Sequence, residues 1–363
     1  MSATLSIVGI VAGDRVYPAT RALAGSIVPF LLLGIYVLYV RTDHTRQLWA
    51  WEIRSPMSAL MLASAYAAGA YYFSRAVFAR RWHHIGRGLL PVLAFATLMC
   101  AVTIVHWPLF LHDNIAFTLW AALYFTTPVL VAAAWWVNRR EDTGRPDEHD
   151  VAVPDRVRRI SRGIGLVGLV TAGLSLLFPG PLIDAWAWPL TPLTARVLCV
   201  IFILFNVYLV ALSRDARWSA ARVNVESLVV ALVLIVVGVV RTRETFIWSR
   251  PAAWLFPVGV VAALVVCLGS LWWAGRGRAI RESPTPDENA MTGDMSRLIG
   301  TLMERLSFEH REILHLAYFQ EFSVQEIADA LDLPANTVKT RMFYARQRLK
   351  VLLEKSGVEG MVA

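Results

Sequence analysis

Long, continuous runs of apolar residues fill most of the first 275 positions of the chain. Their lengths of about 17–23 residues match helices that cross the roughly 30 Å hydrocarbon layer of a bilayer. Helices are the expected form, because lipid offers no partner to an unpaired backbone group. The seventh run is short, and we expect its helix to continue toward Ile247. The eight predicted spans are 22–40, 56–74, 89–111, 117–137, 164–180, 196–213, 227–240 and 255–275.

The composition agrees with a membrane domain. Of the 363 residues, 56% are hydrophobic and 17% are charged, whereas soluble domains carry about 25% charged residues. We therefore interpret residues 1–275 as a multi-pass domain of the plasma membrane, with the lipid bilayer as its surroundings. The start of the chain lacks the charged, apolar and cleavable segments of a signal peptide, so no removable leader is expected.

The arginines predict how this domain is oriented. If the N-terminus is cytoplasmic, the cytoplasmic segments hold 18 arginines and the segments on the other side hold 6. Cytoplasmic loops are the ones enriched in positive residues. Eight spans return the chain to its starting side, so both termini are expected in the cytoplasm.

Tryptophan motifs recur along the chain and predict a tandem repeat. A Trp-Ala-Trp motif at 49–51 precedes the second span, and another at 186–188 precedes the sixth. Trp pairs close the fourth and eighth spans with the same offset. Since these matches fall at equivalent points of the topology, we predict an eight-helix bundle made of two four-helix units in the same orientation. The two units are expected at about 22–137 and 164–275.

Residues that could carry out chemistry are sparse in this domain. Strongly ionisable residues, which mark functional sites inside membranes, are almost absent from the span interiors. No phosphate loop, metal-binding helix or nucleophile arrangement is apparent. Cys100, Cys199 and Cys267 lie singly in apolar runs and are expected to pack there. We therefore predict no catalytic residue, no cofactor and no metal site, and an enzyme or a transporter is the weaker interpretation.

The pattern changes after the last span. Residues 276–294 are polar and contain Pro and Gly, which is typical of a flexible linker. Amphipathic helices are then expected at 295–305, at 308–319, from Ser323, and from 335 to 354. Ser323 and Glu326 have the spacing of a capping box, and Pro334 ends the turn that follows the third helix. Residues 295–355 therefore form a small all-α domain, followed by a tail at 356–363.

A short helix, a tight turn and a longer helix make a helix-turn-helix unit, whose second helix enters the major groove of DNA. Residues 295–333 carry a net charge of −4 and residues 334–355 a net charge of +5, as expected if the last helix faces DNA. Asn and Arg there can read base edges, whereas Lys339, Arg346 and Lys350 are expected to contact phosphates. The alternative is a solvated basic face of a plain helical hairpin. The candidate DNA-binding residues are Asn336, Thr337, Lys339, Thr340, Arg341, Tyr344 and Arg346.

These residues stand in a stretch that resembles region 4 of the sigma-70 family, in its extracytoplasmic-function type. The resemblance is carried by three blocks, HREILHLAYF, SVQEIADAL and TVKTRMFYARQRLK. It implies that the domain reads the promoter −35 element and docks on the flap of RNA polymerase, with the basic helix facing DNA. Nothing before the linker resembles region 2, which melts the −10 element, because membrane spans occupy that place.

Two functional interpretations remain open. In the first, the chain is a membrane-tethered transcription regulator whose partners are promoter DNA and RNA polymerase. In the second, the head is a membrane-anchored interaction module for RNA polymerase or a sigma regulator, which uses the surface around Tyr318 and Phe319 and does not read DNA. The sequence leaves the signal, the target promoter and the oligomeric state open.

Overall fold

The computed structural model describes residues 13–282, 298, 300–318, 320 and 322–356. The chain divides into two compact units, Met1–Arg281 and Glu282–Ala363. Within the described residues every regular element is a helix, and two isolated β-bridges are the only strand-like pairings. The predicted all-α class is confirmed.

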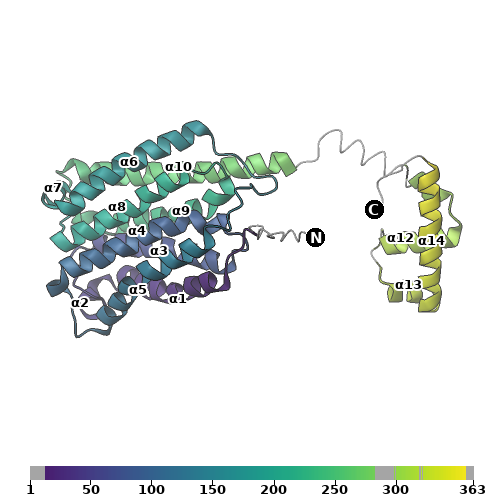
Figure 1. The fold of residues 1–363 in the computed structure, drawn as a ribbon, viewed down its shortest axis with the longest axis horizontal. Coiled ribbons are helices and arrows are strands. Elements are labelled where there is room, and N and C mark those ends of the chain that lie inside the picture. Colours follow the sequence, from purple (N-terminus) through teal and green to yellow (C-terminus); the bar gives the residue numbers. More distant parts are fainter. Residues whose placement is uncertain (1–12, 283–297, 299, 319, 321, 357–363) are drawn as a thin grey trace, which may run out of the picture. The chain divides into compact units, whose positions relative to one another are not determined.

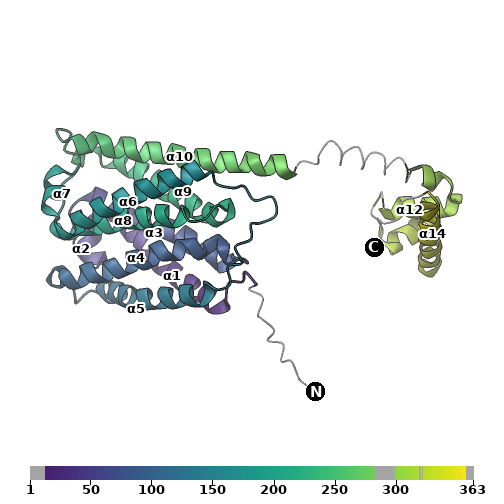
Figure 2. The ribbon, with the colours of Figure 1, turned by 45° about the horizontal axis from the view of Figure 1, so that its top comes forward.

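Eight long helices form the first unit, which we call the membrane unit, and they run side by side in Figures 1 and 2. The short helices α2 (Thr45–Leu48) and α7 (Gly180–Ala185) lie at one end of it. The start of α1 and the end of α10 lie at the opposite end. The long helices are α1 (Pro18–Ile35), α3 (Pro56–Phe78), α4 (His83–Val105), α5 (Ile115–Asn138), α6 (Asp155–Leu177), α8 (Pro192–Leu212), α9 (Trp218–Arg241) and α10 (Pro251–Glu282).

The seventh predicted span has different ends in the structure. Helix α9 begins at Trp218 and stops at Arg241, so it does not continue toward Ile247. The chain turns there through the short helix η4 (Arg243–Thr245), and the backbone N–H of Ile247 donates to the carbonyl of Ala187 at 2.8 Å. The helix begins nine residues before the predicted span, at residues 218–226. This first part contains Arg, Asn and Glu, which are helical but too polar to extend an apolar run.

Seven of the eight long helices are long and apolar enough to cross a membrane. The exception is α3, the second predicted span, which is rich in Ala, Ser and Tyr. It packs between α1 and α9 and most of its residues are buried. Small residues allow helices to approach closely, and a helix shielded by its neighbours does not need the apolar surface of one exposed to lipid. This position explains the lower hydropathy of α3.

Equivalent contacts in the two halves support the predicted tandem repeat. The Tyr72 hydroxyl donates to the carbonyl of Ile85 at 2.6 Å, and the Tyr208 hydroxyl donates to that of Ala221 at 3.3 Å. Each pair joins the second helix of its unit to the third. The packing between the units is also reciprocal, because α3 contacts α9 and α4 contacts α8.

The aromatic clusters at the α2 and α7 end repeat in the same way. Trp51 lies 4.8 Å from Trp120 between ring centroids, and Trp188 lies 5.2 Å from Phe256. Both pairs meet edge to face, an arrangement favoured by the ring quadrupoles. The repeated Trp-Ala-Trp motif thus builds the same corner twice, at the entry to α3 and at the entry to α8.

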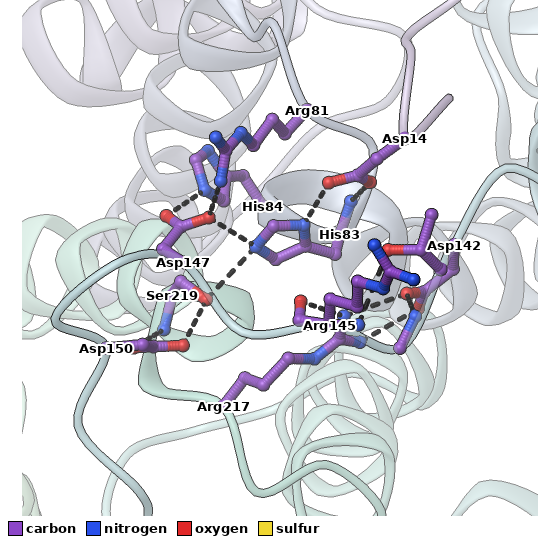
Figure 3. Close-up of polar contacts among 12 residues, drawn as sticks. Asp14, Arg81, His83, His84, Asp142, Arg145, Asp147, Asp150, Arg217 and Ser219 are labelled. Carbon is purple, nitrogen blue, oxygen red and sulfur yellow. Dashed lines mark hydrogen bonds and ion pairs between the residues drawn. The ribbon is translucent and has the colours of Figure 1, made fainter. Parts of the chain in front are cut away.

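A charged network closes the opposite end of the membrane unit. Arg217 is buried in the α8–α9 turn and binds Asp142 with two hydrogen bonds of 2.8 and 2.9 Å. It also donates to Asp215 at 2.8 and 3.0 Å, while Arg87 reaches the same carboxylate at 3.1 Å. Figure 3 shows Arg217 beside Asp142, with the His83 cluster next to it. This network ties the α5–α6 connection to the α8–α9 turn.

The second unit, which we call the head, is a small helical domain with its own hydrophobic core. Residues 300–304 are helical and precede α12 (Phe308–Tyr318), α13 (Val324–Leu331) and α14 (Ala335–Lys355). One cluster packs Ile313 against Ile327 and Val338, and a second packs Leu314 against Ala345. The helix order agrees with the prediction from the amphipathic pattern.

The predicted linker 276–294 is only partly described. Its first seven residues belong to α10, which ends at Glu282. Residues 283–294 and most of the predicted tail lie outside the described residues.

Candidate nucleic-acid interface

Helix α13 is fixed at its start by the capping box expected from the sequence. The Ser323 side chain accepts a hydrogen bond from the backbone N–H of Glu326 at 3.3 Å. In return, the Glu326 carboxylate accepts one from the backbone N–H of Ser323 at 2.7 Å. Hydrogen bonding to the Ser323 side chain and then to its backbone N–H lowers the pKa of the Glu326 carboxyl group. Two helix N–H groups that would lack partners are thereby satisfied.

The cap gives a first testable prediction. Replacing Ser323 with Ala removes one of the reciprocal bonds, and the loss of such a cap costs about 0.5–2 kcal/mol. The midpoint of thermal unfolding of the head, followed by circular dichroism on the soluble fragment 282–363, should therefore fall. Ser323→Asp retains a capping oxygen and should keep most of the stability. Equal midpoints for the Ala and Asp variants would contradict the role of the cap.

The turn between α13 and α14 sets the direction of the basic helix. Asp332 adopts a left-handed backbone conformation with φ of 51°. Asp is one of the few residues other than Gly that tolerate this conformation, because its short polar side chain can form local hydrogen bonds. The next residue, Leu333, donates its N–H to the carbonyl of Ala328 at 3.0 Å, and α14 then begins at Ala335. This compact reversal is the turn of a helix-turn-helix unit.

The buried stripe of α14 faces the head core. Val338 and Ala345 are fully buried, and Met342 and Leu349 are packed against the same clusters. The amphipathic helix predicted from 335 to 354 is therefore confirmed. Burial of the stripe leaves the opposite side of α14 open to solvent.

The structure places the seven candidate DNA-binding residues in two groups. Asn336, Thr340, Lys339, Tyr344 and Arg346 are exposed, whereas Thr337 and Arg341 are partly buried beside the core stripe. The Thr340 hydroxyl donates to the carbonyl of Asn336 at 2.9 Å, so its lone pairs point away from the helix backbone. The helical period of α14 places this exposed group on one side of the helix.

Arg341 and Arg346 each have a partner within the head. The Arg341 guanidinium lies 3.5 Å from the carboxylate of Glu309, which is itself exposed. The Arg346 guanidinium lies 5.4 Å from the ring centroid of Tyr318, a distance typical of a cation–π contact. Both contacts are at the surface, where such interactions are weak, so either side chain can turn toward a ligand.

One exposed residue of this surface was not among the candidates. Phe343 is 63% exposed. The helical period of α14 places it on the same side of the helix as Asn336 and Lys339. The signal in the sequence was an aromatic residue at a position that the period of the stripe places outward. An apolar side chain at such a point can contact the methyl group of thymine.

The head has no cluster of metal ligands among its described residues; the described chain contains one such cluster, and it lies in the membrane unit. The head surface instead combines exposed amide, hydroxyl and basic groups on one helix that a rigid turn presents. These are the groups that bind base edges and phosphates. The fold and surface define a helix-turn-helix DNA-binding domain.

Comparison with known proteins shows which family this domain resembles. Residues 302–351 match the family model described as Sigma-70, region 4. The chain is 37% identical over 78 residues to the ECF RNA polymerase sigma factor SigL of Mycobacterium tuberculosis, in strains H37Rv and CDC 1551. The C-terminal domain of this chain is thus a sigma-70 region 4-like domain, as its sequence blocks indicated.

The similarity is confined to the C-terminal part of the chain. It covers 21% of this chain and 43% of the SigL proteins, so the chain spans less than half the length of those relatives. No solved structure matches the chain.

Proposed function

We propose that this protein is a membrane-tethered transcription regulator, in which the sigma region 4-like head binds promoter DNA together with RNA polymerase under the control of the membrane unit. The observation that carries the proposal is the exposed basic surface of α14 in a domain of this family. The relatives are sigma factors of RNA polymerase by name. A head of this kind is a binding module and needs no catalytic group.

The membrane part of the proposal rests on the apolar helices and on the arginines. Seven helices are suited to cross a bilayer by their length and composition, and in this proposal α3 is the eighth span, packed between α1 and α9. Eight crossings are needed for both chain ends to lie on the same side. The arginine-rich segments meet at one end of the membrane unit, where Arg81 and Arg217 lie in the same polar region in Figure 3. Positive residues of this kind favour the cytoplasmic side. This orientation would put both chain ends, and the head, in the compartment that contains DNA.

Within the head, we assign sequence reading and anchoring to different residues. Asn336 is exposed at the start of α14, the end that enters the major groove in helix-turn-helix proteins, and an Asn there can bind the edge of adenine. Lys339 and Arg346 are exposed cations suited to phosphates. Arg341 would leave Glu309 to reach a base or a phosphate.

Selective binding of DNA tests this proposal. The fragment 282–363 should shift a subset of a genomic fragment pool at physiological salt, and the same sites should be retained by the full chain in lipid nanodiscs. Replacing Asn336 and Arg341 with Ala should abolish the selection while leaving weak, unselective binding, because each good base contact contributes about 1–3 kcal/mol of discrimination. Absence of any selected sequence in both forms would count against DNA reading.

A second candidate function is supported by the aromatic surface of the head. Phe308 and Tyr318 are well exposed and Phe322 is partly exposed, and exposed aromatic groups are enriched at protein interfaces. This surface suits a head that holds RNA polymerase or a sigma regulator at the membrane. Phe319, named with Tyr318 from the sequence, lies outside the described residues. A pull-down of RNA polymerase that is lost in Tyr318→Ala but unchanged in Asn336→Ala would favour this function.

A further inference from the structure

Two adjacent histidines at the start of α4 converge on one carboxylate from a distant part of the chain. The Nε2 atom of His83 lies 3.2 Å from one oxygen of Asp147, and the Nε2 atom of His84 lies 2.8 Å from the other. The three residues each offer one potential ligand atom, and these three atoms lie within 4.8 Å of one another. Figure 3 shows both rings directed at the Asp147 side chain.

The two oxygens that contact the Nε2 atom of His83 offer it no hydrogen, so this atom holds either a proton or a cation. The Nδ1 atom lies 2.5 Å from the Asp14 carboxylate, which can only accept, so Nδ1 carries the hydrogen. The second neighbour of Nε2 besides Asp147 is the Ser219 hydroxyl at 3.1 Å. That hydroxyl gives its one hydrogen to Asp150 at 2.6 Å. A lone pair buried against oxygens that cannot donate is the arrangement that a bound cation satisfies.

We propose that His83, His84 and Asp147 form a binding site for a divalent transition-metal ion of the zinc class. Two imidazole nitrogens and a carboxylate are ligands that Zn²⁺ prefers. With metal–ligand bonds of about 2.0–2.1 Å, tetrahedral ligand atoms lie roughly 3.3 Å apart. The 3.2 Å between His83 Nε2 and Asp147 needs little adjustment, whereas the 2.8 Å contact of His84 Nε2 with Asp147 lengthens when an ion enters. Asp14 is the positioning residue, because a carboxylate on the second nitrogen of a histidine ligand fixes its tautomer and orientation.

Arg81 opposes this ion. Its guanidinium pairs with the same Asp147 oxygen that faces His83, and its charge would repel a metal ion. The Arg81 side chain is 52% exposed, so it can swing into solvent when an ion enters. Arg81 therefore competes with the metal, and its removal should strengthen binding.

The site joins three segments that are far apart in the sequence. Asp14 precedes α1, the histidines begin α4, and Asp147 lies in the α5–α6 connection. The same connection continues to Val151, whose side chain packs against Gly277 near the end of α10. A Cβ atom added at Gly277 would lie only 3.2 Å from the Val151 side chain. A bound ion would fix the connection that supports the helix leading to the head. The proposal concerns the membrane unit alone and does not depend on DNA binding.

The test is metal binding to the full chain, purified in detergent with a tag that contains no histidine and stripped with a chelator. Titration with Co²⁺ should give the visible d–d bands of a tetrahedral site at one ion per chain, and Zn²⁺ should remove them. His84→Ala and Asp147→Asn should each abolish the bands, and Asp14→Asn should weaken Zn²⁺ binding about 10–100-fold. His149→Asn, which removes an exposed imidazole from the same connection, should bind as the wild type does.

Arg81→Ala keeps the proposal falsifiable even where a ligand variant fails to fold. It should bind Zn²⁺ more tightly than the wild type, a gain that misfolding cannot produce. Zn²⁺ should also raise the thermal unfolding midpoint of the wild type and of Arg81→Ala, but not that of His84→Ala. The proposal is overturned if no stoichiometric ion binds, which would leave a proton as the occupant of His83 Nε2. It is equally overturned if binding survives both ligand substitutions or if Arg81→Ala weakens it.

Discussion

Replacing Arg217 with Ala is expected to destabilise the membrane unit by about 3 kcal/mol, since removal of one partner from a buried ion pair leaves an uncompensated charge. The Asp215 side chain is 4% exposed and that of Arg217 is 9% exposed. Arg87 still reaches Asp215 in the variant, which keeps the loss near the lower end of the range for such pairs. Thermal or denaturant unfolding of the purified chain in detergent measures the change.

The pH dependence of this loss follows from the carboxylates. Burial would raise the pKa of Asp215, but the side-chain and backbone hydrogen bonds from Arg217 outweigh it and bring the pKa to about 2 from an ordinary 3.8. A lowered pKa in the folded state stabilises the protein above pH 3.8, and this contribution is lost as the pH falls through about 2. The difference between wild type and Arg217→Ala should therefore be constant from pH 5 to 8, and should shrink once the variant's carboxylates are protonated.

An exposed arginine provides the matched control. Arg222 pairs with Glu226 one helical turn away, and its side chain is 45% exposed. Surface pairs contribute about 0–1 kcal/mol, so Arg222→Ala should have little effect. If the two alanine variants unfold alike, the Arg217 network does not hold the α5–α6 connection in the way its geometry indicates.

The second large effect is expected in the salt dependence of DNA binding by the head. Each phosphate contact releases counterions and contributes about 0.9 to the slope of log affinity against log salt concentration. Replacing Lys339 and Arg346 with Ala should reduce the slope by about 2 and weaken binding to all sequences alike. Fluorescence anisotropy of the fragment 282–363, measured at several salt concentrations, gives both quantities.

Charge-preserving substitutions separate this effect from a loss of structure. Lys339→Arg and Arg346→Lys keep both cations on the exposed side of α14 and should retain the slope. A double alanine variant with an unchanged slope would show that these two side chains do not contact phosphates. The surface that Asn336 and Thr340 share would then have to bind DNA without them.

The predictions from sequence were most successful where structure depends on local pattern. Continuous apolar runs gave the helices of the membrane unit, because a helix in lipid must satisfy its own backbone and present apolar side chains. In the head, the spacing of Ser323 and Glu326 gave the cap, and the stripe through Val338 and Ala345 gave the buried side of α14. The predicted start of α9 was too late because polar helical turns leave no trace in hydropathy, and its predicted continuation toward Ile247 was wrong because the chain turns after Arg241.

The same local reasoning predicted which side of α14 is exposed in the head, but it did not predict the contacts of individual side chains on that side. The helical period placed Asn336, Lys339, Thr340 and Arg346 on the exposed side of α14, whereas Thr337 and Arg341 are partly buried. It did not show that Arg341 pairs with Glu309, a residue of another helix. Phe343 is exposed, as the same period requires, but it was not among the candidates. Whether a side chain is free depends on what the neighbouring helices place beside it.

The amino-acid sequence by itself thus determined the class of the protein: an apolar helical bundle and a basic helix-turn-helix head. Each follows from periodicity and composition over short stretches. Only the tertiary structure buried α3 among its neighbours and brought Asp147 to His83 and His84, across 63 or more residues. No local pattern records that approach, because two distant segments meet only when the packing of the helices between them has fixed their positions.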